Sequence, residues 1–266
     1  MPQVAAPPGG LPRAVAKRGL ERLLWTRVAV QGRWRRWRGV VPARPRPVPP
    51  TEVLRTRADW VAAVDECRRL RLPLHPDRPK NWDSLGAVAT ILASCGPDAA
   101  VLDAGAARYS PVLPWLRLYG LTDLVGVNLE FGAETRHGPV RFRHGDITAT
   151  DLADASLDAV TCLSVIEHGV PVPAFLAEAA RLLRPGGLLV VSTDYDQQPP
   201  DTRGLTAYGV PVHVFSPAEI RDLVGVAAGC GLRLRGELRL DHPERPLHWA
   251  RTGLDFTYVR LTFERE

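Results

Sequence analysis

Cysteine is scarce in this chain, and its spacing argues against two kinds of site. The 266 residues include four cysteines, without a Cys-x-x-Cys pair or a His–Cys cluster. Structural zinc sites and disulfide frameworks need closely spaced or paired cysteines, so we expect neither, and we expect most of these thiols to be buried. No acidic and histidine set at metal-ligand spacing is evident either, so we expect no bound metal.

Long apolar runs are also missing. No stretch approaches the 18 or more apolar residues that a transmembrane helix requires, and no apolar segment follows the basic N-terminus as a secretory signal would need. We therefore expect a cytoplasmic protein, and association with a membrane surface remains an open alternative.

Acidic residues are nearly absent from the first 50 positions. That segment holds eleven Lys and Arg but one acid, Glu21, so its charge is +10 and the other 216 residues carry −5 of the total of +5. The basic character thus belongs to an N-terminal extension, and the pI is no reason to expect that the rest of the chain binds nucleic acid.

The extension, residues 1–50, has three parts. Residues 1–12 are rich in Pro and Gly and predict a disordered start, residues 13–38 predict a basic helix with tryptophans, and residues 42–50 (PARPRPVPP) predict an extended spacer. Such a helix is compatible with a solvated tail, contact with an anionic membrane surface, docking to an acidic partner or, less favoured, stacking on RNA. We place the domain boundary at residue 50.

Residues 51–97 predict two helices. The first spans 51–72, and the second begins at a cap formed by Asp83 or Ser84 and stops before Gly96-Pro97. In the loop between them, Lys80 and Asn81 are within reach of a ligand, but solvated side chains are the more frequent outcome for such residues.

Residues 98–266 alternate short apolar runs with amphipathic helices. Runs at 101–102, 121–131, 140–143, 156–163 and 188–193 read as strands, two β-prone segments at 232–240 and 254–263 read as closing strands, and residues 194–212 read as a long loop. The pattern predicts an α/β fold: a Rossmann-like, seven-stranded, mostly parallel sheet with an antiparallel last strand and helices on both faces.

The turn in VLDAGAARYS, residues 101–110, decides which ligand the fold would hold. A dinucleotide site requires three glycines to bring a helix N-terminus against a pyrophosphate, and here Gly105 is the only glycine. A carboxylate before a turn of small residues instead suits a ligand with an ammonium group, which Asp103 would bind directly or through water.

At this point the sequence resembles the class I S-adenosylmethionine-dependent methyltransferases. The resemblance covers roughly residues 80–266 and rests on four segments in the order that the family shows: VLDAGAA, GDI at 145–147, SLDAVTCLSVIEHG and LLRPGGLLVVST. It implies S-adenosyl-L-methionine as the cofactor and a methyltransferase domain at 51–266, whose cofactor-binding core is 98–266.

The resemblance also implies a set of site residues. Asp103, Gly105 and Ala106 would hold the methionine end of the cofactor, and Asp146 with Ile147 the adenine. Where the family has an acid for the ribose, this chain has Asn128, with Glu130 two residues on, and either would make the contact. The other residues expected to line the cofactor pocket or face the reaction centre are Ser164, Val165, Glu167 and His168.

Methyl transfer to a hydroxyl group requires alignment of the acceptor and removal of its proton. We expect His168 or His213 to be the catalytic base, and the acceptor to be a small hydroxylated molecule such as a sugar or a secondary metabolite. A protein or RNA acceptor is the alternative within the enzyme class, with nucleic acid disfavoured. A non-catalytic binding module and a nicotinamide oxidoreductase are the alternatives outside the class.

Overall fold

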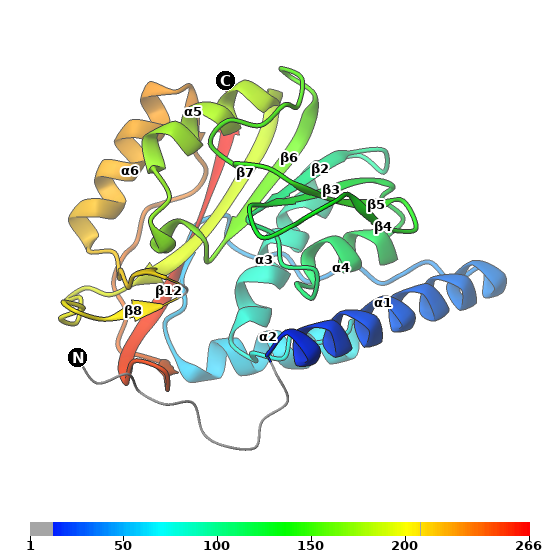
Figure 1. The fold of residues 1–266 in the computed structure, drawn as a ribbon, viewed down its shortest axis with the longest axis horizontal. Helices are drawn as coiled ribbons and strands as arrows, with labels where there is room; N and C mark the ends of the chain where they lie inside the picture. The colour runs from blue at the N-terminus through cyan, green and yellow to red at the C-terminus, as the bar shows by residue number, and fades with distance from the viewer. Residues whose placement is uncertain (1–12, 208) are drawn as a thin grey trace.

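The computed structural model describes residues 13–207 and 209–266. The expected α/β class is confirmed, with helices on both faces of a twisted, mostly parallel sheet (Figure 1). The disorder that the sequence predicts for residues 1–12 lies outside the described residues.

Helices and strands alternate along most of the chain. In order, the elements are α1 (Arg13–Arg38), β1 (Glu52–Val53), α2 (Arg57–Arg69), α3 (Lys80–Ser94), β2 (Ala100–Ala104), α4 (Val112–Leu118), β3 (Asp123–Asn128), β4 (Thr135–His137), β5 (Val140–His144), β6 (Leu157–Leu163), the 3₁₀ helix η1 (Ile166–His168), α5 (Val172–Leu182), β7 (Leu183–Tyr195), β8 (Thr206–Ala207), β9 (Val210–Pro211), α6 (Pro217–Gly229), β10 (Leu232–Leu234), β11 (Leu247–Trp249) and β12 (Leu254–Arg265).

Seven strands form the expected sheet. Strands β5, β3, β2, β6 and β7 are parallel, β12 pairs with β7 in the antiparallel direction, and β10 pairs with β12. Strand β12 is the antiparallel last strand that the sequence predicts. Short strands extend the sheet beyond this set: β1 and β11 pair with β12, and β4 pairs with β5.

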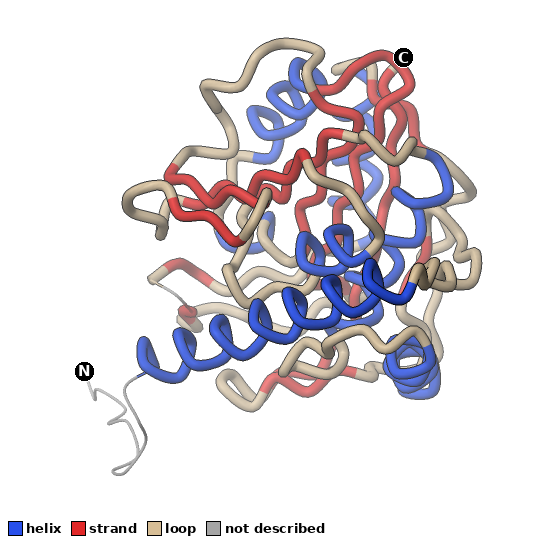
Figure 2. Tube along the Cα trace, turned by 90° about the vertical axis from the view of Figure 1, so that its right-hand side faces the viewer, coloured by secondary structure: helices blue, strands red, loops and turns tan. Residues whose placement is uncertain are grey.

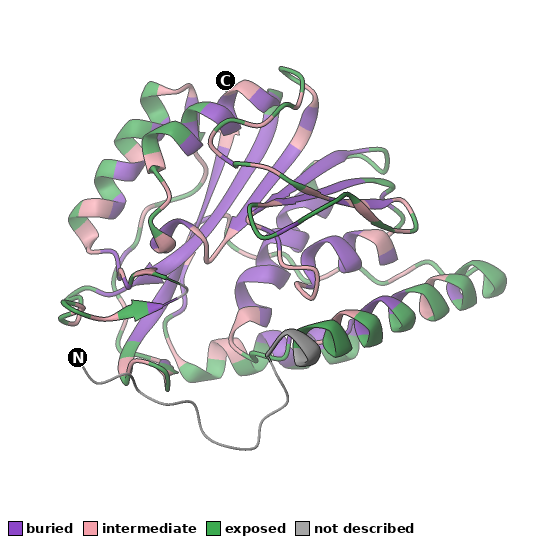
Figure 3. Ribbon diagram, in the orientation of Figure 1, coloured by how far each residue is buried: buried purple, intermediate pink, exposed green. Residues whose placement is uncertain are grey.

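The two faces of the sheet bury separate apolar cores. Neighbouring side chains point to opposite faces of a strand, so Val101 packs under α1 to α4, whereas Leu102 packs under α5 and α6. Strands and inner helix faces are buried, and the outer helix faces are exposed (Figure 3). Strand β2 pairs in parallel with both β3 and β6, which makes it the point where the order of the strands reverses.

Helix α1 is long and crosses one face of the molecule (Figure 2). It packs on α4 through Leu24, Trp25 and Val28, which are buried. The Pro-rich segment 42–50 contains no helix or strand and lies along the domain, where the Pro49 carbonyl accepts a hydrogen bond from Arg260. The division of the chain at residue 50 remains a prediction.

Three local predictions are corrected. Helix α3 begins at Lys80 rather than at an Asp83 or Ser84 cap, because the side chain of Asn81 bonds the His75 backbone and orders the preceding loop. The strand expected at 188–193 begins earlier, at Leu183, so residues 184–187 belong to β7. The strand expected at 232–240 ends at Leu234, because Gly236 turns the chain with a φ of +84°.

Cysteine placement agrees only partly with the expectation of buried thiols. All four cysteines are free; Cys67 and Cys162 are buried, whereas Cys95 and Cys230 are half-buried. No helix among residues 13–207 and 209–266 has the length and apolar character needed to cross a bilayer.

Candidate active site

The turn after β2 lies at the carboxyl edge of the sheet, where open α/β folds bind their ligands. Gly105 has a φ of +76°, and a Cβ added there would lie 2.6 Å from both methyl carbons of Val165. Only glycine allows both this backbone conformation and this approach. Two residues that the sequence assigned to the cofactor pocket, from the ends of β2 and β6, are therefore in direct contact.

Asp103 is buried at the end of β2. Its Oδ1 accepts a hydrogen bond of 2.7 Å from the Thr161 hydroxyl of β6. Burial raises the pKa of Asp103 to about 7, the Thr161 bond opposes that rise, and the nearby charge of Asp83 adds to it. The Asp103 carboxyl is therefore poised to change its protonation state, or to be held as a carboxylate by a cationic ligand.

Asn128 and Glu130 have different surroundings. The Asn128 amide donates to the Ala106 carbonyl at 2.9 Å and accepts from the Glu130 backbone N–H at 2.8 Å, which ties the end of β3 to the turn after β2. The strand expected at 121–131 would carry both residues, but β3 ends at Asn128 and the chain turns, so Glu130 lies outside the strand and the expected bounds are wrong. Glu130 is exposed and lies 3.8 Å from Lys17 of α1.

Asp146 follows β5 in an Asx turn. Its Oδ1 accepts from both the backbone N–H and the hydroxyl of Thr148, and these bonds lower the pKa of Asp146. Ile147 beside it is buried. Asp146 is thus an exposed carboxylate next to an apolar side chain, at the same sheet edge as the turn after β2.

A pocket of about 120 Å³ opens beyond β6 and β7, near the start of β12. Its lining combines the aromatic side chains of Trp249, Phe256 and Tyr258, which form what we call the aromatic wall, with ionisable groups: Asp77, Lys80, Glu167, His168, Asp194 and His248. Asp194 stands opposite Tyr258 in the pairing of β7 with β12. The antiparallel last strand therefore completes the pocket.

Lys80 supplies the positive charge of this pocket. It is one of only two lysines in the chain. Burial alone would lower its pKa, but electrostatic interactions with Tyr258 and with the carboxyl groups of Asp83, Asp194 and Glu167 outweigh that effect and raise it. Its ammonium lies 5.1 Å from the centre of the Tyr258 ring. The sequence favours a solvated side chain at Lys80, because a basic residue in a Pro-rich loop gives no sign that the loop folds inward.

Glu167 and Asp194 are both buried, and the pKa of each carboxyl group is raised. Burial raises the pKa of Glu167 to about 7, although Lys80 and a 3.1 Å hydrogen bond from the Thr193 hydroxyl pull it down. Burial and the charge of Glu167 raise the pKa of Asp194 well above its usual range. Near neutral pH the two carboxyl groups are therefore not both ionised, and an ionised member of the pair is able to accept a proton.

Asp83 links this pocket to the turn after β6. Its Oδ2 accepts a 2.8 Å hydrogen bond from the Ser192 hydroxyl and lies 3.5 Å from that of Ser164. Burial raises the pKa of Asp83, and the charge of Lys80 opposes the rise. Ser164, predicted in the cofactor pocket, has a φ of +52° and thus stands at a strained turn between the two parts of the site.

The two candidate bases lie in different places. His168 lines the pocket, and burial together with the charge of Lys80 lowers its pKa to about 4, so its imidazole is neutral at physiological pH. His213 does not line this pocket; it is 43% exposed, lies 3.0 Å from Glu219 and packs edge-on against Phe215. The structure thus groups Glu167 and His168 with Lys80 and leaves His213 beside the cap of α6.

Comparison with known proteins finds similarity to methyltransferases in the part of the chain that contains the turn after β2. Residues 102–191 match the family profile described as a methyltransferase domain. The chain is 36% identical over 108 residues to a probable S-adenosylmethionine-dependent methyltransferase of Mycolicibacterium smegmatis, covering 36% of this chain and 42% of that protein. It is 34% identical over 129 residues to a demethylmenaquinone methyltransferase of Deinococcus radiodurans, covering 47% and 51%. The chain spans about half the length of the curated relatives it matches.

A solved structure extends the likeness to the fold. Geranyl diphosphate C-methyltransferase from Streptomyces coelicolor superposes with a TM-score of 0.54 at 18% identity, over 84% of this chain and 92% of that one. The matched segment, 102–191, contains Asp103, Gly105, Asp146 and the turn after β6. The chain thus has the fold of a class I S-adenosylmethionine-dependent methyltransferase, and its residues 102–191 match a methyltransferase domain.

Proposed function

We propose that this protein transfers a methyl group from S-adenosyl-L-methionine to a small hydroxylated acceptor bound in the Lys80 pocket. The observation that carries the proposal is the placement of two features side by side at the carboxyl edge of the sheet. One is the small-residue turn at Gly105, and the other is a pocket with a proton-accepting carboxyl pair. The turn after β6, with Val165 and Glu167, connects them.

The residues at the Gly105 turn fit the cofactor. Asp103 offers a buried carboxyl to the cationic methionine end, and Asp146 with Ile147 offers an acceptor beside an apolar surface to the adenine. Either Asn128 or Glu130 would contact the ribose. The Asn128 amide is uncharged and already forms hydrogen bonds with the Ala106 carbonyl and the Glu130 backbone N–H, so a bond to the ribose would be added to these two. S-adenosylmethionine supplies an electrophilic methyl group when bound.

The pocket residues would then prepare the acceptor. The aromatic wall of Trp249, Phe256 and Tyr258 excludes water and packs on the apolar part of the molecule. The Glu167–Asp194 pair, with His168 beside it, accepts the hydroxyl proton, and the Lys80 ammonium balances the charge that the pair gains. An aromatic wall favours an acceptor with a ring or an apolar portion over a fully hydrated sugar.

Calorimetric titration tests the cofactor assignment. We expect heat from S-adenosylmethionine and none from NAD. The Asp103→Asn variant keeps the side-chain volume and removes the charge, so its affinity for S-adenosylmethionine should fall at least about tenfold. Heat with NAD alone would overturn the proposal, and binding without methyl transfer would support a non-catalytic module. Unchanged affinity in Asp103→Asn would remove Asp103 from the site.

Mass spectrometry of a bacterial small-molecule extract incubated with labelled cofactor identifies the acceptor. Label found only in protein or RNA would contradict the proposed acceptor class.

The pH dependence of transfer tests the carboxyl pair. The pair accepts a proton only in its ionised form, so kcat should rise with pH through about 7 and then level off. The Thr193 bond favours the ionised form of Glu167, so Thr193→Val should move this rise upward by about one pH unit. A profile that rises near pH 4 instead would assign the step to His168.

A further inference from the structure

Helix α1 has a second apolar face that points away from the protein. Leu23, Val30, Trp34 and Trp37 are 70%, 63%, 42% and 76% exposed, and at 100° per residue they fall within an arc of roughly 60°. We call these four residues the outer stripe. Seven of the ten exposed large hydrophobic residues in the described part of the chain lie between Leu20 and Val41. Such a concentration marks an interaction surface.

The orientation of this stripe is fixed by the opposite side of the helix. Buried Arg35 donates to the carbonyls of Leu118 and Leu70, at 3.2 Å each. The Trp25 indole donates to the Arg108 carbonyl at 3.0 Å. Because these contacts prevent α1 from rotating about its axis, the outer stripe faces outward in the folded protein.

Arginines flank the stripe on both sides. Arg27 and Arg38 lie along one side, and Arg22, Arg33 and Arg36 along the other. Within residues 13–207 and 209–266, no carboxylate forms an ion pair with any of these five. The one acid of α1, Glu21, is engaged by His137 at 3.0 Å. The face is therefore strongly cationic around an apolar centre.

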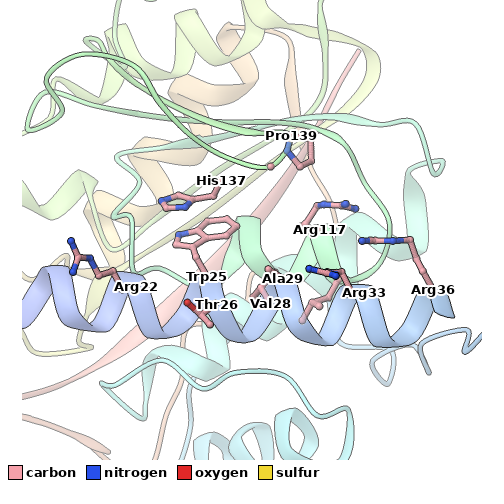
Figure 4. A pocket seen from close by; sticks show the side chains of 13 residues that line it. Arg22, Trp25, Thr26, Val28, Ala29, Arg33, Arg36, Arg117, His137 and Pro139 are labelled. Atoms are coloured by element: carbon pink, nitrogen blue, oxygen red, sulfur yellow. The ribbon is translucent and has the colours of Figure 1, made fainter. Parts of the chain in front are cut away.

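A pocket of about 470 Å³ opens beside the second group of arginines, between α1 and the turn after β4 (Figure 4). The side chains that line it include Trp25, His137 and four arginines: Arg22, Arg33, Arg36 and Arg117. We call this cavity the arginine pocket. The guanidinium groups of Arg36 and Arg117 point toward each other, and burial and the charge of Arg36 both lower the pKa of Arg117. Such like-charged groups are stabilised by an anion bound between them.

We propose that α1 lies on an anionic lipid bilayer, with the outer stripe entering the interface and the arginine pocket binding lipid phosphate groups. The chemistry matches both parts: interfacial helices combine apolar and tryptophan side chains with basic flanks, and guanidinium groups bind phosphate in a bidentate manner. RNA fits less well, because Leu23 and Val30 offer no aromatic face on which bases stack. The proposal does not depend on the methyl-transfer chemistry.

Co-sedimentation of the full chain with vesicles tests this docking. We expect binding to vesicles of 70% phosphatidylcholine and 30% phosphatidylglycerol in 0.1 M NaCl, and partition coefficients at least about tenfold lower with phosphatidylcholine alone or in 0.5 M NaCl. Two double variants, Arg33→Glu/Arg36→Glu in the arginine pocket and Val30→Ser/Trp37→Ser in the outer stripe, should each reduce partitioning at least about tenfold.

A charge-matched control separates docking from general attraction. Arg203→Glu/Arg239→Glu changes the net charge as much as the pocket variant, at exposed arginines elsewhere on the surface. It should retain most of the binding, and all variants should keep the wild-type circular dichroism spectrum. The proposal is overturned if the control loses as much binding as the pocket variant, if the stripe variant binds normally, or if an RNA duplex is bound and vesicles are not. Complete displacement by millimolar glycerol phosphate would also overturn it, in favour of a free-phosphate site.

Discussion

Replacing Lys80 by methionine is expected to reduce methyl transfer by at least about 100-fold at pH 7.5, while the affinity for S-adenosylmethionine changes little. The Lys80 ammonium lowers the pKa of both Glu167 and Asp194. Without it, burial and mutual repulsion raise both pKa values further, so the pair stays protonated and cannot take the acceptor's proton. The measurement is transfer of labelled methyl groups to the small-molecule fraction of a bacterial extract, over a range of pH.

The pH profile distinguishes this role from a structural one. In Lys80→Met the rise in rate should move to higher pH, so activity should recover in part above pH 9. The matched control is Lys17→Met, which removes the other lysine at a half-exposed position on α1. Equal losses in both variants, or a loss in Lys80→Met that no pH restores, would contradict a role in setting the charge of the pair.

Replacing Gly86 by alanine is expected to cost about 2–4 kcal/mol of unfolding free energy. A Cβ at this position of α3 would lie 1.9 Å from Nη1 and 2.3 Å from Cζ of Arg260. Arg260 cannot move aside, because it is 1% exposed, bonds Glu52 and the Pro49 carbonyl, and stacks over Trp82. The variant must displace a buried charge or shift α3, and urea denaturation measures the cost.

Gly225 provides the control for Gly86. It lies within α6, is exposed, and has no atom within 4 Å of an added Cβ. Gly225→Ala should therefore stabilise the protein slightly, by about 0.5–1 kcal/mol, through the helix propensity of alanine. If Gly86→Ala were as stable as Gly225→Ala, Arg260 would have an alternative position and the packing of α3 against β12 would be looser than the structure indicates.

Periodicity identified the strands and helices of the core because their burial is regular. Apolar runs and amphipathic helices follow a fixed repeat along the chain, so the parallel sheet and the antiparallel β12 were predictable. The segments that were misplaced are those where one contact overrides the local pattern. Asn81 moves the start of α3 to Lys80, and the end of β3 at Asn128 turns Glu130 outward.

The sequence by itself determined the order of strands and helices and the small-residue turn at Gly105, because both are recognised from residues that are close along the chain. Only the tertiary structure brought Lys80, Glu167, Asp194 and Tyr258 into one pocket, since they come from α3, η1, β7 and β12. It also separated His213 from His168 and gave α1 an inner and an outer face. The physical reason is that burial and charge act through space, so a pKa or an exposed stripe is set by neighbours that lie far apart in the chain.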